Sequence, residues 1–293
     1  MGLIQQIKSS EKDIREYFDS LTRKVFLKKD IYQILAEKHL LWKLRKTINV
    51  DIFIDQLMEM KLNELKLTSP NYKNTYTRFI WGKCVPIYQL SLSLRSQSYF
   101  THHTAMHILG LTNQKPSTIY VNTEQSVKPD RHSELEQERI NMAFKRKPRV
   151  SKYIFIYKNW EICCVNGINT NKLGVEELNV FTEGKLPVTN IERTLIDIAV
   201  RPVYSGGCKD VLEAYKRAKG KISVNTLMTM LKKINYIYPY HQAIGLYMQK
   251  AGYKDSDLNQ LKKVGMKYDF YLDYAMKKTN YSKEWRIYFP KDL

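Results

Sequence analysis

The sequence predicts an α+β protein of two domains, residues 1–90 and 91–293. Apolar residues recur at helical spacing in three segments before residue 60, and two alternating segments follow them. Beyond residue 90, short alternating segments are interspersed with helical ones, and a run of helical segments comes after residue 206. A chain of 293 residues is long enough for two domains, so the change of pattern near residue 90 is the predicted boundary.

The first domain is predicted to contain three helices and a two-stranded hairpin. Ser10 and Asn49 are the predicted caps of the first and third helices, because a side-chain oxygen there can accept an otherwise unpaired backbone N–H. A second helix around Ile31 is followed by a basic, aromatic insert, "HLLWKLRKT". "LNELKLT" and "TYTRFIWGK" are predicted strands, joined by the turn "SPNYKN". This order is typical of a winged helix-turn-helix, a module that reads DNA.

The second domain is predicted to mix strands and helices. "VPIYQLSLSL" alternates, and we expect a strand or a linker there. Thr101 is the predicted cap of a short helix. Ser133 with Glu136, and Thr189 with Glu192, have the spacing of capping boxes that open two further helices.

The formal net charge of +19 is distributed unevenly along the chain. Residues 1–95 carry 17 basic and 10 acidic side chains, a net charge of +7. Residues 96–200 carry 13 and 11, a net charge of +2, and residues 201–293 carry 18 and 8, a net charge of +10. Such a distribution favours a polyanion or an acidic protein as partner.

The sequence suggests no targeting signal. The start, "MGLIQQIKSS", lacks the apolar run of a signal peptide, and Gln6 stands where a myristoylation signal needs Ser or Thr. No segment approaches the roughly 20 apolar residues of a membrane span. The cysteines have no C-x-x-C spacing, so we expect reduced thiols in a cytoplasmic protein without membrane association.

Two histidines have the spacing of metal ligands, but their context does not favour a metal site. His103 and His107 lie four residues apart, as in a metalloprotease helix, yet Thr104 stands where that motif needs a glutamate. The pair falls opposite the apolar face of its helix, so we expect both side chains to face solvent. The sequence predicts neither a metal nor another cofactor.

Glu183 and Lys185 form the second half of a nuclease pattern, in which carboxylates hold Mg²⁺ and a lysine positions the attacking water. The upstream acid would be Glu161 or Glu176, and neither has the expected context. A metal-dependent nuclease is therefore the enzymatic alternative. The favoured interpretation is a protein that is not an enzyme.

Residues 187–207, "PVTNIERTLIDIAVRPVYSGG", place Glu192, Arg193 and Asp197 within two helical turns. Capping explains Glu192, while Arg193 and Asp197 are spaced for an ion pair within the helix. Pro202 ends the helix, and the glycine pair after it allows the chain to turn. We expect these charged side chains to be scaffold, with any inward-pointing one tying down the next loop.

Three segments resemble the AbiEi antitoxins of type IV toxin–antitoxin, or abortive-infection, systems: "YFTHHTAMHILGL", "STIYVNT" and "LPVTNIERTLIDIAVRPVYSGGCKDVLEAYKRA". That family has a "T–x–x–E–R–T–L–x–D" helix, followed by a proline and a glycine pair. The matching residues here are Thr189, Glu192, Arg193, Thr194, Leu195, Asp197, Pro202, Gly206 and Gly207. The resemblance covers roughly residues 95–255.

The resemblance implies an N-terminal winged helix that binds the double-stranded DNA of its own promoter and represses it. It also implies a C-terminal α/β antitoxin domain that counteracts a nucleotidyltransferase-like toxin in phage defence, without needing a stable complex. No catalytic residues carry over. The remaining alternative is an interaction module of a defence operon whose winged helix does not bind DNA.

If the first domain binds DNA, we expect its insert and wing to contact phosphates. The predicted DNA-binding residues are Lys43, Arg45, Lys46, Gln56, Lys73 and Arg78. The third helix presents Asp51, Asp55 and Glu59 on its polar side, which is unfavourable next to phosphates. We therefore expect that helix to read few bases.

Overall fold

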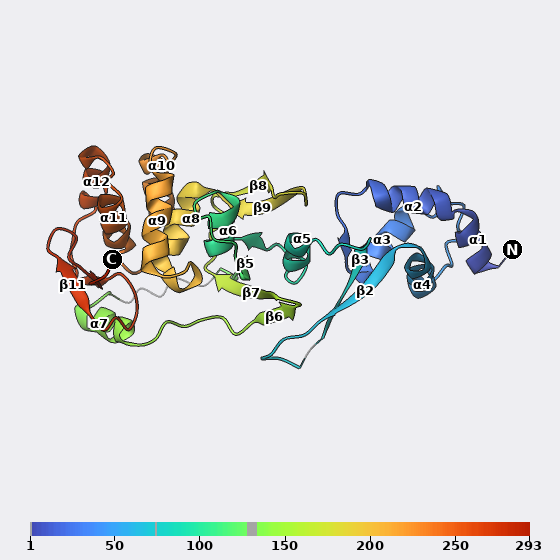
Figure 1. Ribbon diagram of the computed structural model, residues 1–293, viewed down its shortest axis with the longest axis horizontal. Coiled ribbons are helices and arrows are strands. Elements are labelled where there is room, and N and C mark those ends of the chain that lie inside the picture. The colour runs from blue at the N-terminus through green and yellow to red at the C-terminus, as the bar shows by residue number, and fades with distance from the viewer. Residues whose placement is uncertain (1, 74, 128–133) are drawn as a thin grey trace. The chain divides into compact units, whose positions relative to one another are not determined.

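The protein has an α+β fold, as the sequence predicts. The computed structural model describes residues 2–73, 75–127 and 134–293 (Figure 1). The chain divides into two compact units: unit 1 comprises residues 1–97, 153–162 and 178–186, and unit 2 comprises residues 98–152, 163–177 and 187–293. The sequence-based division at residue 90 assigns the two later segments of unit 1 to the second domain.

Unit 1 consists of short helices and an antiparallel sheet (Figure 1). Its helices are α1 (Leu3–Ser9), α2 (Glu11–Ser20), α3 (Lys28–Lys38), α4 (Val50–Met60) and α5 (Ile87–Leu92). Its strands include β1 (Val25–Phe26), β2 (Leu62–Leu67), β3 (Tyr76–Trp81) and β6 (Ile154–Tyr157). The first three form a sheet in the order β1-β3-β2, with both pairs antiparallel.

Aromatic side chains from helices, insert and sheet form the core of unit 1. Phe18 of α2 stacks on Trp81 of β3 with ring centroids 4.8 Å apart. Trp42, which lies in the basic insert, stacks on Phe53 of α4 at 5.9 Å. All four rings are buried. Because each buried aromatic removes a large apolar area from water, these contacts fix the insert onto α4.

Unit 2 contains most of the remaining elements. Its helices are α6 (His102–Ile108), α7 (Gln137–Lys145), α8 (Ile191–Val200), α9 (Cys208–Ala218), α10 (Val224–Ile234), α11 (Tyr240–Lys250) and α12 (Asp255–Lys262), with a 3₁₀ turn at Pro202–Tyr204. Its strands include β4 (Tyr99–Phe100), β5 (Thr118–Glu124), β10 (Phe270–Tyr271), β11 (Thr279–Ser282) and β12 (Ile287–Pro290). Strands β7 (Trp160–Gly167), β8 (Val175–Asn179) and β9 (Lys185–Thr189) contribute residues to both units.

Two sheets complete the fold. The larger has six strands in the order β6-β7-β5-β4-β9-β8, and the smaller has the order β10-β12-β11. Within the larger sheet, β4 pairs antiparallel with β5 and parallel with β9, where Phe100 lies opposite Val188. The parallel pairing places the ends of β4 and β9 together, so the helices that follow these strands, α6 and α8, begin beside one another.

Helix α8 is the centre of unit 2. It contacts α6, α9, α10 and α11, and every residue from Arg193 to Val200 is buried. The neighbouring helix α11 includes Gly245 because Trp285 packs against its backbone. A Cβ at position 245 would lie 2.0 Å from that indole ring, a distance no side chain tolerates.

Several predicted elements differ from those observed. "VPIYQLSLSL" forms helix α5 and not a strand or a linker, because Glu183 accepts the backbone N–H groups of Tyr88 and Gln89 and so caps the helix from a distant part of the sequence. Ser10 precedes α2, but its hydroxyl donates to the carbonyl of Trp42. The predicted cap Ser133 lies outside the described residues, and α7 begins at Gln137.

Other predictions are confirmed. Asn49 caps α4, accepting the N–H of Asp51 at 2.8 Å. Strands β2 and β3 lie where the sequence predicts the hairpin. Among the described residues, no helix is long and apolar enough to cross a membrane.

Candidate functional site

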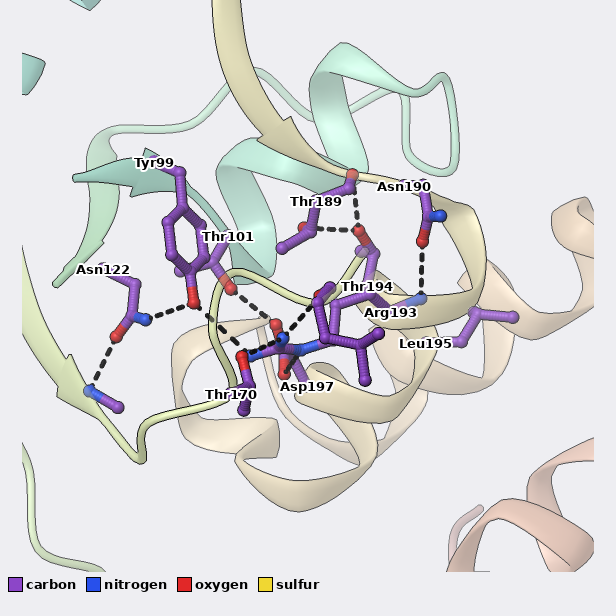
Figure 2. Close-up of polar contacts among 12 residues, drawn as sticks. Tyr99, Thr101, Asn122, Thr170, Thr189, Asn190, Arg193, Thr194, Leu195 and Asp197 are labelled. Carbon is purple, nitrogen blue, oxygen red and sulfur yellow. Dashed lines mark hydrogen bonds and ion pairs between the residues drawn. The ribbon is translucent and has the colours of Figure 1, made fainter. Parts of the chain in front are cut away.

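The motif residues on α8 form a buried ion pair with complete hydrogen bonding (Figure 2). Arg193 Nε donates to Asp197 Oδ1 at 2.8 Å, and both side chains are less than 10% exposed. Burial alone would lower the pKa of the Arg193 guanidinium, but the adjacent Asp197 carboxylate outweighs burial and raises it. Arg193 therefore keeps its positive charge inside the protein.

The rest of the guanidinium ties down the loop between β7 and β8. Arg193 Nη1 donates to Thr170 Oγ1 at 3.0 Å and to the carbonyl of Leu173 at 2.8 Å, while Nη2 approaches the hydroxyl of Tyr99 at 3.4 Å. Figure 2 shows Tyr99 and Thr170 approaching the ion pair from separate segments of unit 2. The inward-pointing Arg193 does hold a loop, but this loop precedes the helix in the sequence and is not the next one, which the sequence led us to expect.

Asp197 connects α8 to the start of α6. Thr101 Oγ1 donates to Asp197 Oδ2 at 2.9 Å, so both carboxylate oxygens have a partner. Thr101 was expected to cap α6 with this hydroxyl, but α6 has no side-chain cap. The sequence does not indicate that α8 is contacted by Thr101, Tyr99 and Thr170. Nothing in the local pattern links these residues to a helix 20 or more residues away.

The predicted capping box at the start of α8 is wrong. Strand β9 extends through Thr189, so the helix cap is Asn190, whose side chain accepts the N–H of Arg193 at 3.0 Å. Thr189 instead shares a hydrogen bond with Thr194 inside the core. Glu192 accepts the N–H of Ser223 at 2.9 Å and thus supports the start of α10. The family-motif residues Thr189 and Glu192 are scaffold, in roles other than those predicted.

The motif glycines form the turn between the 3₁₀ segment and α9. Gly206 and Gly207 have φ angles of 82° and 91°, which side-chain-bearing residues rarely adopt. A Cβ on Gly206 would also lie 1.9 Å from the Asp210 carboxylate. The sequence prediction that this pair allows a sharp turn agrees with these angles.

The histidine of interest on α6 is not one of the two that the sequence singled out. His103 and His107 are half-buried, so the expectation that they face solvent is wrong. The residue before them, His102, is 6% exposed, has a φ angle of 51°, and leaves Nδ1 without a hydrogen-bond partner within the described ranges. Burial lowers the pKa of His102 to about 4, and the nearby Asp197 opposes this shift only in part.

A polar cavity of about 370 Å³ lies beside the ion pair in unit 2. His102, Arg193 and Asp197 line it, together with Arg149, Arg201 and residues of the 165–168 segment. The cavity is not apparent from the sequence, because its walls come from six separate parts of the chain. Among the described residues, no group of three or more His, Cys, Asp or Glu side chains could hold a metal ion.

The basic insert of unit 1 combines buried anchors with exposed charges. Trp42, Leu44 and Ile48 are buried, and Lys43, Arg45 and Lys46 between them are exposed. The carbonyl of Trp42 accepts the Ser10 hydroxyl at 2.6 Å, and the N–H of Leu44 donates to the His39 carbonyl at 2.7 Å. The three predicted phosphate-contacting residues therefore lie together on an ordered segment.

The other predicted DNA contacts differ among themselves. Lys73 is exposed in the loop between β2 and β3. Arg78 is 5% exposed and donates to Ser93 Oγ at 2.8 Å and to the Ser93 carbonyl at 2.6 Å, so the prediction that it contacts phosphate is corrected. Gln56, at 6% exposed, donates to Glu59 and is likewise not on the surface. Arg78 lies on the buried face of β3 and Gln56 on the buried face of α4.

The helix predicted as the third of the first domain is α4, and lysines partly neutralise its negative charge. Asp51 pairs with Lys28 at 2.5 Å, and Glu59 pairs with Lys8 at 3.7 Å. Asp55 is exposed and has no ion pair in the described part of the chain. The repulsion of phosphates expected from this helix is therefore concentrated at Asp55.

The nuclease-like pair has a structural explanation in unit 1. Glu183 accepts the N–H of Gln89 at 2.8 Å and that of Tyr88 at 3.2 Å, while Lys185 is exposed. Burial raises the pKa of the Glu183 carboxyl, and the backbone hydrogen bonds oppose that shift. The carboxylate thus acts as the cap of α5.

These elements define the class of the protein as α+β, with a helix-and-hairpin first unit and a mixed second unit. No protein-family model matches the sequence, and no curated protein matches it. Among solved structures, the crystal structure of the RV2827C protein from Mycobacterium tuberculosis is similar, with a TM-score of 0.57. That similarity covers 96% of this chain and 91% of the other at 13% sequence identity, and it shows a shared fold alone.

We expect Arg193 and Asp197 to stabilise the fold as a coupled pair. Removing one partner leaves a buried charge unpaired, so Asp197→Leu should lower the free energy of unfolding by about 3–5 kcal/mol. Arg193→Met combined with Asp197→Leu should cost about 1–3 kcal/mol less than the sum of the single changes. Urea unfolding at neutral pH measures all three variants.

The matched control for these single and double variants is Glu192→Gln on the same helix. Its amide oxygen can still accept the N–H of Ser223, so the loss should stay below about 1 kcal/mol. Strictly additive effects of Arg193→Met and Asp197→Leu would contradict the assignment of the pair as scaffold.

Burial of His102 predicts loss of stability on mild acidification. Its pKa is lowered from 6.5 to about 4 in the folded protein. The unfolded chain therefore binds a proton between these values and the folded one does not, so stability falls as pH falls through this window. From pH 7 to pH 5 the linked loss is about 2 kcal/mol.

The measurement is the free energy of unfolding at both pH values for the wild type and for His102→Asn, since asparagine tolerates positive φ. The variant should lose about 2 kcal/mol less than the wild type. An equal loss in both proteins would show that His102 titrates normally.

Proposed function

We propose that this protein is a DNA-binding antitoxin of a type IV toxin–antitoxin operon. Unit 1 acts as a winged helix-turn-helix that binds the operon's own promoter and represses it. Unit 2 counteracts a nucleotidyltransferase-like toxin encoded beside it. Both partners belong to the cytoplasm, where we place the protein.

The observation that carries the DNA-binding half is the anchored basic insert between α3 and α4. Lys43, Arg45 and Lys46 are exposed and adjacent, and the buried indole of Trp42 holds the backbone between them and α4. Ordering cationic side chains before binding reduces the entropy lost when they meet phosphates. Phosphate contacts supply most of the affinity of such proteins and position them on the duplex.

The arrangement around the insert supports the same proposal. Helix α2, strand β1, helices α3 and α4, and strands β2 and β3 follow one another in the order of a winged helix-turn-helix. The loop between β2 and β3 corresponds to the wing and presents Lys73. Lys28 and Lys8 neutralise two of the three acidic side chains on α4 that would repel a phosphate backbone.

The antitoxin half rests on the resemblance of the α8 motif to the AbiEi antitoxins. Its two charged residues form a closed pair whose hydrogen-bonding groups are occupied by Thr101, Thr170 and Leu173. Such a pair suits a scaffold that holds a surface, and it leaves neither group free for acid–base chemistry. A role in neutralisation without catalysis is consistent with this.

Replacing Lys43, Arg45 and Lys46 together by Glu should weaken binding to the intergenic DNA upstream of the gene. Each lost phosphate contact lowers the slope of log K against log salt concentration by about 0.9, so the slope should decrease by about 2.7. Asp55→Ala should leave binding unchanged or strengthen it, because an exposed carboxylate is removed from α4. Fluorescence anisotropy across a salt series, with random DNA alongside, measures each effect.

A control with the same change in net charge replaces Lys221, Lys254 and Lys263, exposed lysines of unit 2, by Glu. It should retain most of the wild-type affinity and slope. If the wild type shows no preference for the upstream DNA at any salt concentration, promoter repression is ruled out. The alternative function, an interaction module that does not bind DNA, is then favoured. Loss of specific binding in Asp55→Ala would mean that this carboxylate reads a base, such as a cytosine amino group.

Co-expression with the adjacent nucleotidyltransferase-like gene should restore growth that the toxin arrests. The triple Lys43, Arg45 and Lys46 variant should rescue growth as well as the wild type does, because the antitoxin motif lies in unit 2. The readout is colony formation with both genes under separate inducible promoters. Rescue by neither protein, although both are folded and expressed, would contradict the antitoxin assignment.

A further inference from the structure

The polar cavity beside α8 has the dimensions of a small-molecule site. Its volume of about 370 Å³ lies in unit 2, and small-molecule sites typically measure about 300–1,000 Å³. It is bounded by the start of α6, the end of α8, the 149–151 segment and the 165–168 segment. A cavity of this size can hold one small ligand.

The charge that the cavity presents is positive. Arg193 and Asp197 on its wall cancel one another. Arg149 and Arg201 also line it, and neither forms an ion pair or a hydrogen bond through its side chain with any described residue. The Arg201 guanidinium lies over the ring of Tyr274, 5.7 Å from its centroid. Two guanidinium groups without anionic partners favour a phosphate or a carboxylate.

The remaining walls supply aromatic rings and unused hydrogen-bonding atoms. His102, Tyr204 and Tyr236 all line the cavity, and the first two rings lie 5.2 Å apart in an edge-to-face arrangement. His102 Nδ1 is buried and has no hydrogen-bond partner among the described residues. The Tyr236 hydroxyl likewise makes no hydrogen bond to them. A buried polar atom such as His102 Nδ1 is normally satisfied, so a bound polar ligand would complete it.

From these observations we propose that the cavity binds a mononucleotide. Arg149 and Arg201 hold its phosphate, the tyrosine rings pack against its base, and His102 Nδ1 hydrogen-bonds to a polar atom of the ligand. A planar ring joined to an anion matches this combination of aromatic walls and guanidinium groups. The proposal goes beyond promoter binding and toxin neutralisation, and it depends on neither.

The test is isothermal titration calorimetry of the full-length protein with AMP, GMP, CMP and UMP, and with inorganic phosphate and adenosine for comparison. At least one mononucleotide should bind with a Kd below about 1 mM. Arg149→Gln and Arg201→Gln should each weaken that binding about tenfold, because each removes a charge-assisted hydrogen bond. His102→Asn should also weaken it, while leaving the arginines in place.

The matched control is Arg146→Gln, which removes an exposed arginine three residues from Arg149 and outside the cavity wall. It should bind as the wild type does, and so should the triple Lys43, Arg45 and Lys46 to Glu variant of unit 1. Arg149 is exposed, so its substitution tests binding without endangering the fold.

Three results would overturn the proposal. The first is the absence of binding heat with all four mononucleotides. The second is inorganic phosphate binding as tightly as the best nucleotide, which would leave the rings without a role. The third is binding that Arg149→Gln and Arg201→Gln leave intact, or that the unit 1 variant abolishes, since the ligand would then occupy another site. Failure of promoter binding would leave the titration unaffected.

Discussion

The ion pair between Arg193 and Asp197 is the constraint on which unit 2 depends. Both groups are buried in α8, the helix that contacts α6, α9, α10 and α11. An unpaired charge there would be severely destabilising, so the pair persists only if every donor and acceptor around it is satisfied. Thr101, Thr170 and the Leu173 carbonyl meet that requirement, and in doing so they fix the start of α6 and the 170–173 loop against α8.

The same pair shapes the neighbouring cavity. Because its two charges cancel, the field inside the cavity is set by Arg149 and Arg201, which have no carboxylate partner in the described segments. His102 remains neutral in this environment, since burial lowers its pKa to about 4. A neutral imidazole can donate or accept through its free nitrogen. The ion pair and the lining of the proposed ligand cavity therefore belong to one network of contacts.

In unit 1, buried side chains hold the basic insert in place. A basic segment of nine residues would be mobile on its own, but burial of Trp42 and Leu44 within it, and of Ile48 directly after it, holds it in place. The lysines and arginine between these anchors then point to solvent as a consequence. The aromatic stack of Trp42 on Phe53 links that segment to α4, so the position of the charges depends on the core and not on the charges themselves.

Local sequence determined the elements that depend on neighbours along the chain. Periodicity and a capping oxygen located α4, alternation located the hairpin of β2 and β3, and composition identified the insert as basic. Tertiary structure decided whatever depends on distant partners. Glu183 caps α5 from a distant part of the sequence. The side chains of Arg78 and Gln56 are buried. Strand β9 extends through Thr189, so the cap of α8 is Asn190. The cavity belongs to this second group, because a single sequence records which side chains exist but not which distant segments the sheet brings together.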